Sequence, residues 1–158
     1  RRQRQMCIKR QSLNCIKDFE DGKSESVKNN KPILLDFTGW ACANCRRVEE
    51  NTWSEPKVYE MINNEFILIS LYVDDRSDLN QDQIIILTDK NGNEKTLKKV
   101  GEKWSAFQTI NFKNNSQPYY VLLSPNLEVL NKPIQYTDTD TYQSWLSEGL
   151  ENFKKNYK

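Results

Sequence analysis

Extended runs of strand length, most of them apolar, alternate with polar segments along this chain. They occur at residues 33–37, 65–73, 84–88, 94–97, 118–124 and 128–130. The run at 65–73 is nearly continuous, which is typical of a central strand covered on both faces. Asn91-Gly92 between two runs is a favoured hairpin turn, and Pro125-Asn126 predicts a second turn. The pattern therefore predicts a sheet with an inserted hairpin.

Apolar positions three and four residues apart predict helices between these strands. The helical segments are 16–30, 42–53, a segment that restarts at 54, 100–112, and a last one from 137 or 139 to the end. Gly22 weakens the first helix, and Ser54 is the expected N-cap of the third, with Pro56 in its first turn. Because helices separate most strands, we expect an α/β fold with a mixed sheet covered by helices on both faces.

Composition narrows the class of protein. With 37% hydrophobic and 28% charged residues, the 158-residue chain is typical of one globular domain. Its 23 basic and 22 acidic residues leave a net charge of +1, so no overall electrostatic field favours nucleic acid as a partner. We also expect the domain to be a monomer. Basic residues gather near the start, so residues 1–14 are predicted to be a flexible basic arm and residues 15–158 the folded domain.

The sequence shows no targeting or membrane segment. No apolar run approaches the ~20 residues that span a bilayer, and no signal peptide is visible. The chain starts at Arg1 rather than at an initiator Met, so we expect a fragment or a processed form of a longer protein.

Histidine is absent, which excludes Ser-His-Asp and Cys-His catalytic sites and histidine-ligated metals. The four cysteines are Cys7, Cys15, Cys42 and Cys45. A zinc site made only of cysteines usually combines two closely spaced pairs, and seven residues separate Cys7 from Cys15. These two cysteines can pair with each other or remain free, and neither has a predicted catalytic role.

The pair Cys42-Ala-Asn-Cys45 follows the strand at 33–37 and opens the helix at 42–53. Such a pair can be half of a metal site, a structural disulfide or a dithiol that exchanges electrons with other proteins. Unpaired N–H groups and the dipole at a helix start stabilise a thiolate, which favours Cys42 as the attacking sulfur. Cys45 lies one turn deeper on the same face and is predicted to resolve the mixed disulfide that Cys42 forms.

Two carboxylates are candidates for the proton transfers of this exchange. Asp36 sits between Leu35 and Phe37 in a buried strand, where an acid is out of place unless it is paired or functional. Glu49 follows Cys45 by about one helical turn, on the same face of the helix. The alternatives are a satisfied buried acid for Asp36 and a solvated charge for Glu49.

Three stretches resemble proteins with the thioredoxin fold. They are Leu35-Asp-Phe37, Cys42-x-x-Cys45 and Pro118, a proline that opens a later strand. More narrowly, residues 31–58 are similar to the C-terminal periplasmic domain of the DsbD family of thiol:disulfide interchange proteins, in particular the Bacteroidetes type. Residues 68–75, 104–112 and 117–123 support the likeness. The spacer Ala43-Asn44 departs from the Gly-Pro of thioredoxin, and Trp40 stands one place earlier than the tryptophan that often precedes the first cysteine.

The resemblance implies a thiol-disulfide oxidoreductase working in the reductase direction, with no cofactor beyond the Cys42–Cys45 disulfide. It implies that Asp36 and Glu49 tune the pair and that Pro118 is a cis-proline. It also implies electron transfer from a membrane domain of the same protein, supplied by cytoplasmic thioredoxin, to periplasmic disulfide proteins. The location would be the periplasm, as the C-terminal domain of an inner-membrane protein. The alternatives are a free-standing periplasmic reductase and a thiol-based metal-binding module.

Overall fold

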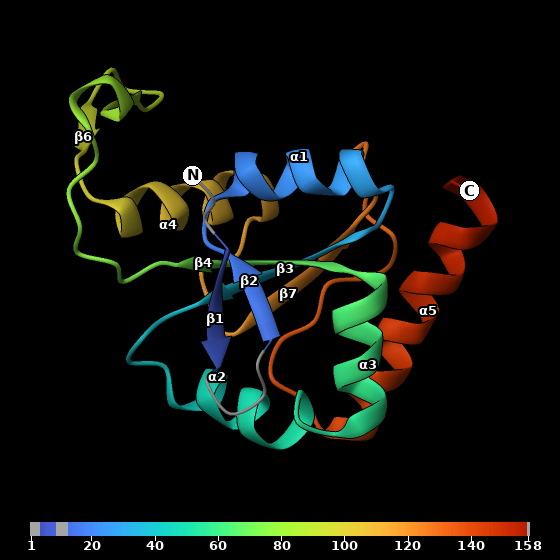
Figure 1. The fold of residues 1–158 in the computed structure, drawn as a ribbon. Coiled ribbons are helices and arrows are strands. Elements are labelled where there is room, and N and C mark those ends of the chain that lie inside the picture. Colours follow the sequence, from blue (N-terminus) through green and yellow to red (C-terminus); the bar gives the residue numbers. More distant parts are fainter. Residues whose placement is uncertain (1–3, 9–12, 158) are drawn as a thin grey trace.

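The computed structural model describes residues 4–8 and 13–157, with side chains from residue 13 onward (Figure 1). Five strands form the main sheet: β1 (Arg4–Ile8), β2 (Leu13–Ile16), β4 (Ile67–Tyr72), β3 (Ile33–Thr38) and β7 (Tyr119–Leu123), in that order. The central strand β3 runs parallel to β4 and antiparallel to β7, whereas β1 and β2 pair antiparallel at the other edge. The sheet is mixed, as predicted.

Helices cover both faces of this sheet (Figure 1). They are α1 (Phe19–Asn29), α2 (Ala43–Arg47), the π-helix η1 (Val48–Thr52), α3 (Pro56–Glu65), α4 (Val100–Phe112) and α5 (Thr139–Tyr157), and a short 3₁₀ turn η2 (Gln81–Gln83) precedes the hairpin. Helices α1 and α4 lie on one face, and η1, α3 and α5 on the other. None of the helices between residues 13 and 157 is long and apolar enough to cross a membrane.

Alternating residues of β3 divide the core into two layers. Leu35 packs with Phe19 of α1 and Trp104 of α4, whereas its neighbour Leu34 packs with Trp145 of α5 and with η1 and α3. Successive side chains of a strand point to opposite faces, so Asp36 lies on the same face as Leu34. The strand thus carries one acid into the layer below the helix that holds the cysteines.

The N-terminal part of the sheet differs from the predicted arm. Strand β2 begins at Leu13, a buried residue, and pairs with β1 on one side and β4 on the other. The predicted boundary at residue 15 therefore falls within a strand of the sheet. The basic side chains of residues 1–12 lie outside the described side chains.

Three local predictions differ from the structure. Ser54 does not cap α3, because its hydroxyl donates to the Glu50 carbonyl and α3 instead begins after Glu55. The segment at 128–130 is not a strand but contributes one isolated bridge, between Val129 and Leu123. The helix from residue 43 changes after Arg47 into a π-helix, in which the Trp53 N–H donates to the Val48 carbonyl.

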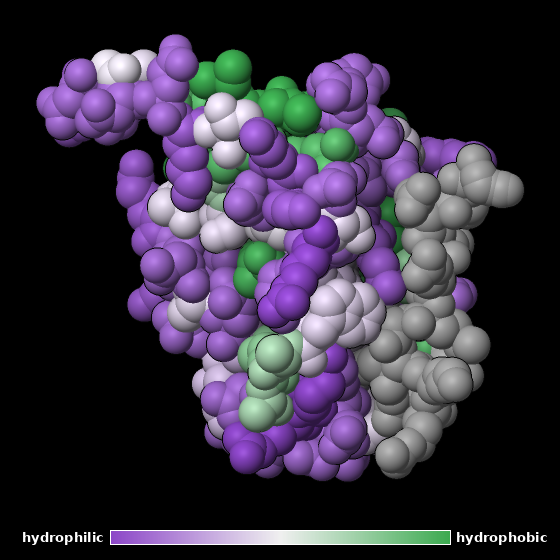
Figure 2. All heavy atoms as spheres, turned by 90° about the vertical axis from the view of Figure 1, so that its left-hand side faces the viewer, coloured by the Kyte–Doolittle hydropathy of each residue, from purple (hydrophilic) through white to green (hydrophobic). Residues whose placement is uncertain are grey.

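The predicted hairpin is confirmed and forms a separate two-stranded sheet of β5 (Ile85–Thr88) and β6 (Glu94–Leu97). Gly92 adopts a φ of +86° in its turn, where glycine carries no side-chain penalty. The hairpin stands away from the main sheet in Figure 1, and the projecting tip is hydrophilic in Figure 2. At its base, Leu87 and Leu97 line a hollow with Phe107 and Ile110 of α4.

Gly22 brings α1 unusually close to β4, because a Cβ at this position would overlap the side chain of Ile69. Helix propensity alone predicts that Gly22→Ala stabilises the fold by about 1 kcal/mol. We expect the overlap with Ile69 to outweigh the gain in helix propensity. The free energy of unfolding should then fall by about 2 kcal/mol, the usual cost of overpacking. Urea denaturation measures this change, with Ser24→Ala on the exposed side of α1 as the control. An equal gain in both variants would contradict the close packing.

Candidate active site

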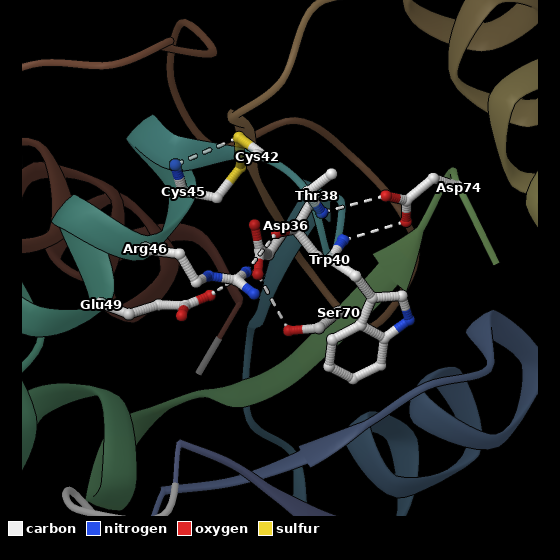
Figure 3. A network of polar contacts seen from close by, with 10 residues as sticks. Asp36, Thr38, Trp40, Cys42, Cys45, Arg46, Glu49, Ser70 and Asp74 are labelled. Atoms are coloured by element: carbon white, nitrogen blue, oxygen red, sulfur yellow. Dashed lines mark hydrogen bonds and ion pairs between the residues drawn. A yellow bond between two sulfur atoms is a disulfide. The ribbon is translucent and has the colours of Figure 1, made fainter.

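The two cysteines of the predicted pair form a disulfide at the junction of β3 and α2 (Figure 3). Their Cα atoms are 5.2 Å apart, and Cys42 is the N-cap of α2, where its Sγ accepts the Cys45 N–H at 3.1 Å. Cys42 is half-buried, whereas Cys45 is only 1% exposed. The two sulfurs are therefore unequal in access, as the spacing and the helix start predict.

The loop before Cys42 is held by an acid from the neighbouring strand. The carboxylate of Asp74, just after β4, accepts the Trp40 N–H at 2.9 Å and the Ala41 N–H at 3.1 Å. The Cys42 N–H donates to the Gly39 carbonyl and closes the turn. Because the carboxyl ends of the parallel strands β3 and β4 meet at one edge, Asp74 can fix the main chain that leads into the disulfide.

Trp40 presents an ordered aromatic surface beside the disulfide. Its ring stacks on Tyr72 with centroids 3.9 Å apart, and the Lys17 ammonium lies 4.7 Å from the centre of the Trp40 ring. Trp40 nevertheless remains 51% exposed. A half-exposed tryptophan that is held on one side by stacking and by hydrogen bonds of its loop presents a pre-organised contact surface near Cys42.

Asp36 is buried in the middle of the sheet. It is 2% exposed and lies directly opposite Ser70 in the β3–β4 register, where the Ser70 hydroxyl donates to its Oδ2 at 2.9 Å. In the view of Figure 3 it lies between the disulfide and Ser70. Burial, followed by the nearby Glu49 carboxylate, raises the pKa of Asp36 from 3.8 to about 8. Asp36 can therefore hold or release a proton near neutral pH.

Glu49 points into the same layer instead of into solvent. It is 7% exposed, and the Arg46 guanidinium donates to its Oε2 at 2.7 Å. Burial raises the pKa of Glu49 to about 7, although Arg46 opposes the rise. The same Arg46 Nη2 donates to the Thr38 hydroxyl at 3.2 Å. The alternative interpretation from the sequence, that Glu49 is a solvated charge on the helix surface, does not fit this placement.

The remaining predicted residues take up separate positions. The Gln117–Pro118 peptide bond is cis, as the resemblance implies. Cys15 is fully buried and is not a free thiol, and the side chain of Cys7 lies outside the described side chains. Between residues 13 and 157, no cluster of three or more acidic or cysteine side chains is arranged to hold a metal ion.

Arg46, Ser70 and Asp74 belong to the site but were not predicted from the sequence. Ser70 interrupts an otherwise apolar strand. Because a buried polar residue needs a hydrogen-bond partner, its position could have indicated a contact with a buried acid on the adjacent strand. Asp74 follows β4 at the edge where Cys42 follows β3, which the rule for parallel strands could have indicated. Arg46 carries no comparable signal, because basic residues after the first turn of a helix are common on surfaces.

Sequence comparison relates this site to known proteins. A family model described as thioredoxin-like matches residues 14–125. The thiol:disulfide interchange protein DsbD of Campylobacter jejuni (strain RM1221) is 38% identical over 73 residues, which are 46% of this chain and 12% of that protein. The chain thus spans about an eighth of the length of this curated relative.

Solved structures are similar in fold. The oxidoreductase DsbH matches with a TM-score of 0.62 and 13% identity, covering 88% of this chain and 85% of its own. The C-terminal domain of Neisseria meningitidis DsbD in the reduced form matches with a TM-score of 0.52 and 13% identity, covering 81% and 90%. These likenesses confirm the predicted fold, and the sequence match to DsbD confirms the resemblance. Since the family model spans most of the chain, the protein belongs to the thioredoxin-like family.

Proposed function

We propose that the domain is a thiol-disulfide oxidoreductase that reduces disulfides of other proteins through Cys42 and Cys45. The observation that carries the proposal is the unequal access of the two sulfurs: Cys42 is half-buried at the start of α2, and Cys45 is buried one turn below it. Only the outer sulfur can meet a partner disulfide in line, and the inner one is placed to displace the partner afterwards.

The exchange begins with both cysteines reduced. The Cys42 thiolate attacks one sulfur of the partner disulfide, which forms a mixed disulfide and releases the other partner sulfur as a thiolate. Cys45 then loses its proton and attacks the Cys42 sulfur, which forms the Cys42–Cys45 disulfide and releases the second partner thiolate. Both released thiolates take up protons, so the partner gains two electrons and two protons and the domain becomes oxidised.

Asp36 is proposed as the group that takes the Cys45 proton, with Glu49 as its tuning neighbour. The support is that Asp36 lies in the layer below Cys45 and has a pKa near 8, so its ionised and protonated forms are both populated near neutral pH. Pro118 is proposed to present the adjacent main chain to an extended partner segment, as the family resemblance implies. The redox pair needs no further cofactor in this scheme.

The physiological donor and acceptor follow from the likeness to DsbD, of which the chain covers a small part. We propose that a membrane domain of the same protein reduces the pair, and that the acceptors are periplasmic proteins with disulfides. In this scheme the domain is located in the periplasm. A free-standing periplasmic reductase would use the same site with a different donor, and the proposed chemistry of Cys42 and Cys45 is the same in both cases.

Insulin reduction tests the proposed activity. The purified domain, kept reduced with dithiothreitol, is mixed with oxidised insulin, and the appearance of insulin thiols is followed. We expect an acceleration over dithiothreitol alone that disappears when the cysteines are alkylated first. A rate equal to that of the alkylated domain would contradict the proposal. Stoichiometric uptake of copper or zinc by the reduced domain, without insulin reduction, would support the metal-binding alternative instead.

A further inference from the structure

Arg46 occupies an unusual place for a basic residue on a surface helix. Its stem rises to the surface and its side chain is about one third exposed, but its guanidinium reaches inward to Thr38 and Glu49, both of which are buried. Figure 3 shows this group on the inner side of α2, facing the layer that holds Asp36. Its Nε is buried and makes no hydrogen bond to the described residues. A structural arginine usually pairs all its buried nitrogens, so the placement favours a role for the charge itself.

The groups around Arg46 include more acid than base. Asp36 comes from β3 and Glu49 from η1, with Glu50 next to it on the exposed side. Three tyrosines interact with Asp36, namely Tyr72 from β4, Tyr120 from β7 and Tyr142 from α5, and burial raises the pKa of each. The tyrosines therefore stay neutral, and the charge of the layer depends on Asp36, Glu49 and Arg46.

Two buried carboxylates in one layer resist ionising together, and the Glu49 carboxylate raises the pKa of Asp36 accordingly. One buried cation can balance one of these charges. Arg46 lowers the pKa of both Asp36 and Glu49, directly bonded to Glu49 and through space to Asp36. The two acids can therefore share a single negative charge at neutral pH, and the guanidinium balances that charge.

We propose that Arg46 is a positioning residue that keeps one negative charge on the Asp36–Glu49 pair, below the Cys42–Cys45 disulfide. The inference rests on the proposed function, in which the ionised form of Asp36 takes the Cys45 proton. Without the guanidinium, both carboxyl groups would remain protonated at neutral pH, and the reduced pair would lack an ionised acceptor. The residue acts through the acids and does not touch the sulfurs.

Arg47 provides a matched control for this idea. It follows Arg46 in the same helix and carries the same charge, but it is exposed and donates only to the Asn44 side chain, at 2.5 Å. Arg46→Met and Arg47→Met therefore remove one positive charge each, at adjacent positions near the disulfide. A general effect of charge on the Cys42 thiolate would appear in both variants, whereas an effect through the buried acids would appear only in Arg46→Met.

The first readout is the titration of the side-chain carboxyl carbons of Asp36 and Glu49, followed by NMR in the oxidised, ¹³C-labelled domain. We expect Arg46→Met to raise the pKa of both groups by about one unit, Arg47→Met to leave them within about 0.2 units, and Arg46→Lys to restore most of the change. This measurement does not depend on reductase activity, so it stands even if the proposed function fails. Equal pKa values in Arg46→Met and Arg47→Met would overturn the inference.

The second readout is the pH profile of the reaction between the reduced domain and oxidised insulin. We expect the acid limb of Arg46→Met to move upward by about one pH unit, with a rate at pH 7 about tenfold lower and a normal rate above pH 9. Recovery at high pH and a native circular dichroism spectrum separate this result from misfolding. A rate that is lowered equally at every pH would overturn the inference, and a wild-type domain without activity would instead refute the proposed function.

Discussion

Cys45→Ala is expected to stop turnover and to leave the domain joined to its partner. In this variant Cys42, the half-buried sulfur, can still attack, but the buried sulfur that displaces the partner is missing. The mixed disulfide therefore accumulates up to one partner per domain, because exchange with a second external thiol is slow when the junction is partly covered. Mass spectrometry of the reduced variant after reaction with oxidised insulin measures the adduct, and non-reducing gels measure its lifetime.

Cys42→Ala is the matched control for this experiment. It retains one thiol of the same pair, but that thiol is 1% exposed and lies below the helix start. We expect no turnover and no adduct from this variant. Accumulation of the adduct in Cys42→Ala, with none in Cys45→Ala, would reverse the two roles. The same trap, applied to a periplasmic extract with Cys45→Ala as bait, tests whether the proposed periplasmic acceptors exist.

Asp36→Asn is expected to stabilise the oxidised domain, and to do so more at high pH. The carboxyl group of Asp36 loses its proton near pH 3.8 in the unfolded chain but near pH 8 in the folded protein. Between these values the folded protein binds more protons than the unfolded chain, so the free energy of unfolding falls as pH rises. Asparagine has no such titration, and its side-chain oxygen can still accept the Ser70 hydroxyl.

The size of this effect follows from the two pKa values. Wild type and Asp36→Asn should be similar in stability at pH 4, and the variant should be more stable by on the order of 5 kcal/mol at pH 8. Urea denaturation at both values measures the difference, with the disulfide intact so that no thiol titrates. Asp82→Asn, which replaces an exposed acid, serves as the control and should show no pH-dependent gain. A gain that is the same at pH 4 and pH 8 would mean that Asp36 is ionised throughout.

The strands and the cysteine pair were predictable because their signals are local. A continuous apolar run such as the one that contains Ile67 and Leu71 can hardly be anything but a buried strand, and an acid inside a similar run marks Asp36 as unusual. The spacing of Cys42 and Cys45 after a strand fixes their order in space. These features require no knowledge of which elements pack together.

The rest of the site depends on contacts between distant segments. Asp74 meets the loop at Trp40 only because β3 and β4 are parallel neighbours, and Ser70 meets Asp36 only in one register of that pair. Glu49 and Cys45 are both buried, as their shared helix face indicates, but the change of hydrogen-bond spacing at Val48 was not predicted. A pattern of α-helical spacing cannot report such a change, since it assumes one period throughout.

The segment that carries the β5–β6 hairpin could be replaced by a segment of another length, because its two ends already lie side by side. The Leu79 N–H donates to the Lys98 carbonyl, and Asp78 forms an isolated bridge with Lys99, so the two ends of the segment already meet in the body of the protein. The hairpin contributes no strand to the five-stranded sheet. Variation in its length would add little loop-closure entropy and would leave the redox pair unmoved. Related domains could thus acquire different appendages at this point while they keep the same chemistry at Cys42 and Cys45.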